Sequence, residues 1–167
     1  SGTLAYARTF QHAFRPSEEI LSTVFPDSFV FLQPYSEIAH SSFWLTEKYY
    51  KFVLAVVEIP VYGVPAAFLT LVVHSLLNEI TSEFAVLEPD IVLETLYIRL
   101  NQILGLSPNP EALNAQVRIG LCVIDPSDQN IRFAGAGSSL ILVRQNDVFE
   151  FPGHDTGLGY TPEPVLG

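Results

Sequence analysis

The stretch FVLAVVEIPVYGVPAAFLTLVVHSLLNEI, residues 52–80, decides the fold. It opens with the apolar, β-branched residues of a buried strand, which ends at Glu58. Pro60 and Gly63 predict a tight connection, and Pro65 suits the first turn of a helix that runs to about residue 84. Glu58 thus lies at a strand end that is followed by a tight turn and a helix. Metals and ligands commonly bind at such strand ends, because the rigid elements fix the geometry of the side chains. The alternative is that Glu58 is only a solvated charge at a strand end.

The rest of the chain predicts helices on both sides of this stretch and hairpin-linked strands in the last third. The expected helices are 3–15, 18–24, 65–84 and 90–104, and the expected strands are 28–33, 43–45, 50–58, 116–125, 131–134, 140–144 and 148–151. Turns are expected at 46–48 and 145–147, each between two strands. Because strands and helices do not alternate regularly, the order predicts an α+β fold of antiparallel sheets covered by helices.

The composition fits one domain that spans residues 1–167. Hydrophobic residues make up 49% of the chain and charged residues 16%, which is too apolar for a disordered segment. The most apolar run, 64–77, is interrupted by His74 and Ser75 and is too short to span a bilayer. We therefore interpret it as a core helix and expect no membrane insertion.

The formal charge is −10, from 8 basic and 18 acidic residues. Such a surface repels phosphate backbones, so nucleic acid and anionic membranes are unfavourable partners. The alternative is that this acidity only keeps an apolar domain in solution. Cys122 is the single cysteine and cannot form an intrachain disulfide, which favours a reducing compartment, the cytoplasm. The chain has no methionine, so we expect it to be a piece of a longer protein.

Common catalytic motifs are absent from the sequence. The histidines are far apart, at His12, His40, His74 and His154, with no zinc-binding spacing. No P-loop, GxGxxG or GxSxG motif occurs. The segment Gly135-Ala136-Gly137 lies between two expected strands, so it predicts a bend with close backbone approach.

Several segments carry, in order, a resemblance to a known family. They are 7–17 (ARTFQHAFRPS), 26–34 (PDSFVFLQP), 63–68 (GVPAAF), 76–80 (LLNEI), 120–125 (GLCVID), 133–137 (FAGAG) and 142–144 (LVR). Together they resemble the bacterial SpoIIE-type serine phosphatase domain, of the metal-dependent phosphatase 2C-like superfamily. The resemblance covers nearly the whole chain. It implies a layered α-β-β-α sandwich with mainly antiparallel sheets, truncated at the C-terminus before the family's final Ser-Asp-Gly.

The metal-binding motifs of that family are altered in this sequence. Ser42 stands where the resemblance places the first metal aspartate, in Ser-Gly-Asp-Phe-Tyr-Trp. Residues 57–63 align with the family's Gly-Asp-x-Thr-Gly-His-Gly. In this alignment Glu58 replaces the aspartate, Ile59 occupies the variable position x, and Gly63 is the last glycine. Arg118 replaces the second acid of Asp-Gly-Met-Asp. These five residues are expected to be vestigial metal-site positions, with Glu58 as the only residual metal candidate.

The resemblance implies a reaction in which two divalent metals activate a water that attacks a phosphoserine. Such metals need several carboxylates, and a guanidinium about 5 Å from a dication costs about 6–7 kcal/mol at an effective dielectric constant of about 20. We therefore expect a catalytically inactive, phosphatase-like regulatory or protein-binding module, with no catalytic residue and no cofactor. The alternative is a weak or altered metal-dependent serine/threonine phosphatase that uses Glu58, Mg or Mn, and an aspartate beyond Gly167. A purely structural spacer is a third reading.

The resemblance also implies a partner, because relatives often act in partner-switching signalling. We expect a protein partner such as a phosphoprotein regulator. The helix within residues 1–16 places Leu4, Phe10 and Phe14 near one face, which predicts a homodimer. The alternative is that these side chains pack on their own domain.

Overall fold

The computed structural model describes residues 18–31, 41–61, 63–85, 87–106 and 116–159. Its helices are α2 (Glu18–Val24), α3 (Val64–Glu83) and α4 (Pro89–Gly105). Its strands are β1 (Ser41–Lys48), β2 (Lys51–Glu58), β3 (Arg118–Asp125), β4 (Asn130–Ala136), β5 (Leu140–Arg144) and β6 (Asp147–Phe151). The expected helix at 3–15, with Leu4, Phe10 and Phe14, lies outside the described residues.

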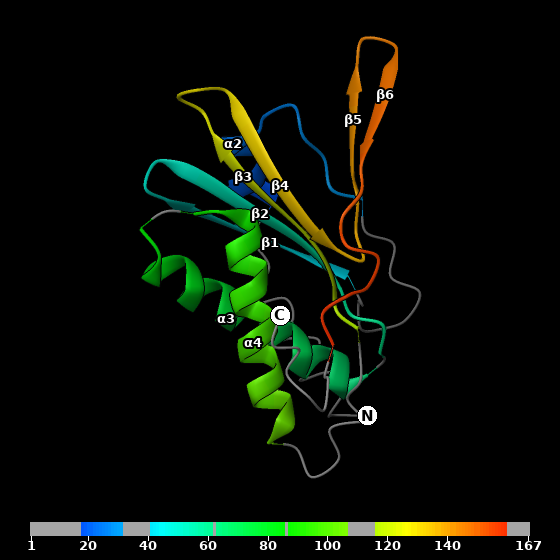
Figure 1. Cartoon of the computed structure of the whole chain (residues 1–167). Helices are drawn as coiled ribbons and strands as arrows, with labels where there is room; N and C mark the ends of the chain where they lie inside the picture. The colour runs from blue at the N-terminus through cyan, green and yellow to red at the C-terminus, as the bar shows by residue number, and fades with distance from the viewer. Residues whose placement is uncertain (1–17, 32–40, 62, 86, 107–115, 160–167) are drawn as a thin grey trace.

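A four-stranded sheet in the order β1-β2-β3-β4 forms the centre of the fold, and every neighbouring pair is antiparallel. Helices α3 and α4 lie together against one face of this sheet (Figure 1). The layered α+β architecture with antiparallel sheets is therefore confirmed.

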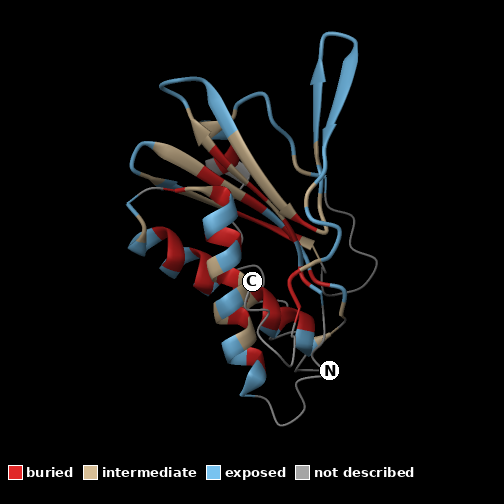
Figure 2. Cartoon of the chain, viewed as in Figure 1, coloured by how far each residue is buried: buried red, intermediate tan, exposed pale blue. Residues whose placement is uncertain are grey.

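The core lies between the sheet and these two helices (Figure 2). Alternate residues of the central strands point into it because side chains in a strand alternate between the two faces. The fully buried strand residues are Val53, Ala55, Val57, Ile119, Leu121 and Val123. Helix α3 is long and apolar enough to cross a membrane by length and composition. Ten of its residues are buried, which makes it the core helix that the sequence predicted.

The opposite face of the sheet is covered only in part. Helix α2 and residues 25–31 lie over it, and the Phe25 ring meets the Phe52 ring edge to face at 5.7 Å. Val56, in the middle of β2, remains 54% exposed on this face. This outer face is therefore apolar and incompletely shielded from water.

Two local expectations are wrong. Residues 28–31 do not form a strand, since they pair with no strand in the described part of the chain. The first hairpin turns at Tyr49 and Tyr50, with φ of 53° and 62°, and not at 46–48. The reason is register: each residue of β1 pairs with one of β2, so the strand continues to Lys48. Tyrosines rarely adopt positive φ, and the sequence therefore carries no signal for this turn.

The close backbone approach predicted at Gly135-Ala136-Gly137 is confirmed, but β4 continues to Ala136 and the chain bends at Gly137. A side chain at Gly135 would collide with the backbone oxygen of Ser138. The backbone of His154 bridges this bend, with its N–H donated to the Gly135 oxygen and its oxygen accepting from the Gly137 N–H, both at 2.7 Å. Beyond the bend, β5 and β6 form a separate two-stranded sheet that projects away from the body of the molecule (Figure 1).

Candidate functional site

Glu58 and Arg118 lie side by side where β2 ends and β3 begins. They are direct partners in the antiparallel register. Arg118 Nη1 is 3.5 Å from Glu58 Oε2, and the two side chains are 55% and 49% exposed, respectively. The structure therefore joins two residues, 60 positions apart in sequence (118 − 58), as an ion pair at the predicted metal position.

Gly137 makes room for this arginine. A Cβ on Gly137, whose φ is +63°, would lie 3.0 Å from Arg118 Cγ. The aliphatic stem of Arg118 thus passes closely over the backbone of the β4–β5 bend. The direct pairing of Arg118 with Glu58 places both side chains on the same face of the sheet.

Ser42 does not join this group. In the register of β1 and β2, Ser41 faces Glu58, whereas Ser42 faces Val57. Because neighbouring residues point to opposite faces, the Ser42 side chain projects toward the helices. There, Ser42 Oγ lies 3.1 Å from His74 Nε2 of α3, and both residues are buried. The Ser42 hydroxyl is therefore part of a buried polar pair in the core.

The other two predicted positions serve the backbone and the core. Ile59 is fully buried and belongs to the hydrophobic core. Gly63 adopts φ 74° directly before α3, in the left-handed region that glycine tolerates best. Pro65 lies in the first turn of α3, as expected. The turn and the start of the helix therefore form as predicted, whereas Ile59 contributes an apolar side chain to the core and no polar group to the site.

The described residues do not fit a pair of divalent metals. Among them, no group of three or more histidine, cysteine, aspartate or glutamate side chains is close enough to hold a metal ion. Hard divalent cations take several oxygen ligands, usually with more than one carboxylate. Among the five predicted positions, the sole carboxylate is that of Glu58, and it already faces a guanidinium.

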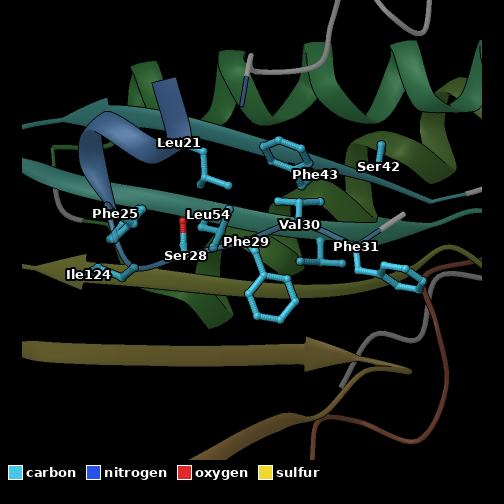
Figure 3. A pocket seen from close by; sticks show the side chains of 11 residues that line it. Leu21, Phe25, Ser28, Phe29, Val30, Phe31, Ser42, Phe43, Leu54 and Ile124 are labelled. Carbon is cyan, nitrogen blue, oxygen red and sulfur yellow. The ribbon is translucent and has the colours of Figure 1, made fainter. Parts of the chain in front are cut away.

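An apolar pocket of about 450 Å³ lies between the outer face of the sheet and residues 21–31 (Figure 3). Its walls are mostly aromatic and aliphatic. They comprise Leu21, Phe25, Phe29, Val30, Phe31, Phe43, Leu54, Val56 and Ile124, with Ser28 and Ser42 as the polar members. Figure 3 shows Ser42 pointing toward the helix layer, away from the phenyl rings of Phe29 and Phe31. The pocket therefore suits an apolar group and offers little chemistry.

A second cavity, of about 810 Å³, lies beside α4 and the end of β4. Its ionisable lining residues are Asp90, Glu94 and Tyr97 from α4, and His154 from the returning chain. Thr156 Oγ1 lies 3.0 Å from His154 Nδ1, which fixes the orientation of that imidazole. None of the described residues that line this cavity is a lysine or arginine, so these residues favour cationic or neutral groups over anions.

Two ionisable groups elsewhere in the sheet have shifted pKa values. The Asp125 carboxylate accepts a hydrogen bond from the Ser127 hydroxyl at 2.6 Å and pairs with Lys51 Nζ at 3.0 Å. The Ser127 hydrogen bond, with the Lys51 contact, lowers the pKa of Asp125 from 3.8 to about 2. Burial on the sheet raises the pKa of the Cys122 thiol, which favours an inert cysteine.

Sequence reasoning missed Ser41 and the contact of His74. Counting alternate positions along β1 from Trp44, which faces the helices, would have placed Ser42 on the inner face and Ser41 beside Glu58. His74 gave no comparable signal because its partner lies 32 residues away in the sequence.

Comparison with known proteins identifies the fold. No protein-family model and no curated protein sequence matches this chain. Among solved structures, the SiaA-PP2C domain of Pseudomonas aeruginosa is similar, with a TM-score of 0.78 and 20% sequence identity. The similarity covers 95% of this chain and 62% of that chain. The chain thus has the fold of a PP2C-type phosphatase domain, and it spans less than two thirds of the solved chain.

Proposed function

We propose that this chain is a catalytically inactive phosphatase-like domain, of the SpoIIE type, that regulates or binds a protein partner in bacterial signalling. The observation that carries the proposal is the Glu58–Arg118 pair. Glu58 is the one carboxylate among the predicted metal-site positions, and its charge is balanced by the guanidinium of Arg118. The family name rests on the sequence resemblance, and the PP2C fold supports it.

The charge at this site opposes the binding of two metals. Two-metal hydrolysis of a phosphate needs carboxylates to hold both cations and to offset their charge. Here a dication near Glu58 would meet the positive charge of Arg118 at short range. The hydroxyl of Ser42, proposed to replace the first metal aspartate, is already engaged with His74 in the core. Both positions are therefore unfavourable for a metal as the chain is folded.

The alternative function is a weak or altered serine/threonine phosphatase that depends on Mg or Mn. It would need Glu58 to leave Arg118 and further carboxylates to come from residues beyond Gly167. The exposure of the Glu58–Arg118 pair favours this alternative to a limited extent, because an exposed pair is weak and separates at low cost.

The expected partner is a protein, and a phosphoprotein regulator fits the signalling systems that the resemblance implies. We place the module in the cytoplasm, with no nucleic acid partner and no membrane insertion. The charge of −10 supports a partner with a basic surface. A homodimer through Leu4, Phe10 and Phe14 remains part of this proposal.

Calorimetric titration of the purified chain with MnCl₂ and MgCl₂ tests metal binding, and a phosphoserine peptide assay tests turnover. We expect no binding at micromolar metal and no metal-dependent phosphate release. Arg118→Asp, which restores an acid at this position, should bind Mn more tightly than Arg118→Gln, which only removes the charge. Micromolar metal affinity of the unaltered chain, together with metal-dependent turnover, would establish the alternative.

A further inference from the structure

The contact between Arg118 and Glu58 is long and open to water. Its N···O distance of 3.5 Å exceeds the roughly 2.8 Å of a charge-assisted hydrogen bond, and both side chains are about half exposed. Exposed pairs usually contribute less than about 1 kcal/mol, because holding two long side chains in one geometry costs entropy. The ion pair alone is therefore a weak reason for the guanidinium to stay at this place.

The aliphatic stem of Arg118 makes a second contact, with glycine backbone. A Cβ added to Gly137 would lie 3.0 Å from Arg118 Cγ and 3.2 Å from the backbone nitrogen of Gly157. The stem and the Gly157 backbone therefore both border the small space that a side chain at position 137 would fill. An arginine stem gains from such packing while its charged end remains in water.

Backbone hydrogen bonds fix the returning chain at this place. Val117, the residue directly before β3, exchanges both backbone hydrogen bonds with Leu158, at 2.7 and 2.8 Å. The Gly137 N–H donates to the His154 oxygen at 2.7 Å. The returning chain is thus tied both to the start of β3 and to the bend. Arg118 lies where these three segments meet.

We propose that Gly137 and Gly157 are positioning residues that seat the stem of Arg118, so that the guanidinium stays at the predicted metal position whether or not Glu58 pairs with it. This inference rests on the proposed function and deepens it, since an arginine held in this way is a constant positive charge at the site. A dication near Glu58 would meet that charge even after Glu58 had turned toward the metal. The bend and the returning chain thereby help to keep the site closed to metals.

Gly63 provides a matched control for Gly137. Gly137 has φ +63°, and a side chain there would enter the space beside the arginine stem. Gly63 has a similar φ of +74°, but a Cβ on it would meet no atom within 4 Å. Alanine at either position pays the cost of the left-handed region, whereas only alanine at position 137 pushes against Arg118.

NMR relaxation of the Arg118 Nε–Hε group tests the proposal, and Arg118→Lys assigns the signal by removing it. We expect an order parameter above about 0.6, the value below which a group counts as flexible, in the unaltered chain and in Glu58→Gln. Gly137→Ala should lower the order parameter below about 0.6, whereas Gly63→Ala should not. Backbone amide spectra check that each variant is folded.

Added salt separates the two contacts in the unaltered chain, without a variant that could fail to fold. At about 1 M NaCl the Debye length falls to about 3 Å, so the exposed ion pair is screened while the packing of the stem is not. Arg118 should therefore remain ordered at high salt.

The proposal is overturned if Arg118 is mobile in the unaltered chain, or becomes mobile in Glu58→Gln or at high salt. It is also overturned if Gly137→Ala leaves Arg118 ordered, or if Gly63→Ala mobilises it equally. The calorimetric titration of the unaltered chain is a separate readout. Manganese binding there, with Arg118 ordered, would refute the proposed inactivity and leave the seat of Arg118 established.

Discussion

Glu58 and Arg118 face each other directly across β2 and β3, with Arg118 Nη1 3.5 Å from Glu58 Oε2. On the other side of β2, Ser41 of β1 is also a direct partner of Glu58. The predicted metal position is thus a row of a hydroxyl, a carboxylate and a guanidinium. Such a row is close to neutral as a whole and has no surplus of negative charge to attract a cation.

The Glu58–Arg118 pair should contribute little to stability, because both side chains are about half exposed. A double-mutant cycle with Glu58→Gln and Arg118→Gln should give a coupling free energy of about 0.2–1 kcal/mol, decreasing with added salt. Urea unfolding of the four proteins measures it. A coupling of several kcal/mol would mean that the pair is structural, and would weaken our view of it as an altered ligand site.

The Ser42–His74 contact should contribute more to stability than the Glu58–Arg118 pair, because both residues are buried. Ser42→Ala leaves His74 Nε2 without its hydroxyl partner, which should lower the free energy of unfolding by about 1–2 kcal/mol. Ser82→Ala is the control, since Ser82 lies on the same helix as His74 but its hydroxyl is exposed. We expect the control to change stability by less than about 0.5 kcal/mol. Equal losses for the two variants would argue against a structural role of the buried contact.

Gly135 and Gly120 are cross-strand partners that should respond differently to a methyl group. Gly135→Ala drives its Cβ into the Ser138 backbone oxygen, so the bend must move, at a cost of about 1–3 kcal/mol. The nearest neighbours of a Cβ at Gly120 are the Ser138 hydroxyl at 3.0 Å and the Phe133 ring at 3.4 Å, and these side chains adjust more easily than backbone. Thermal unfolding should rank Gly135→Ala clearly below Gly120→Ala. The reverse order would contradict the close approach of Gly135 to the Ser138 backbone.

Asp125 should make stability depend on pH at the acidic end. Its pKa in the folded chain is about 2, below the usual 3.8, so folding favours the ionised carboxylate. The stabilisation is fully present above about pH 4 and is lost as the pH falls through about 2. Carbon-13 NMR titration of the side-chain carboxyl measures this pKa directly. Ser127→Ala removes the main hydrogen bond and should raise the pKa of Asp125 toward 3.8; a midpoint near 3.8 in the unaltered chain would refute the prediction.

Most elements could be predicted from the sequence because their signals are local. The expected helices 65–84 and 90–104 correspond to α3 and α4, since proline at the start and an apolar core-facing set are read within one segment. The hairpin from β5 to β6 was equally visible, because the polar residues 145–147 separate two short apolar runs. The turn at Tyr49 and Tyr50 could not be predicted, because its position is set by the pairing of β1 with β2. The two tyrosines themselves carry no turn signal.

The sequence by itself determined that residues 52–80 form a buried strand, a tight turn and a core helix, and that Glu58 ends that strand. It also determined that a positively charged residue, Arg118, stands where the family resemblance places an acidic metal ligand. Only the tertiary structure decided that Arg118 lies beside Glu58, and that Ser42 turns inward to His74. The physical reason is that a strand's register sets which face each side chain occupies, and long-range pairing with β2 fixes that register for β1 and β3.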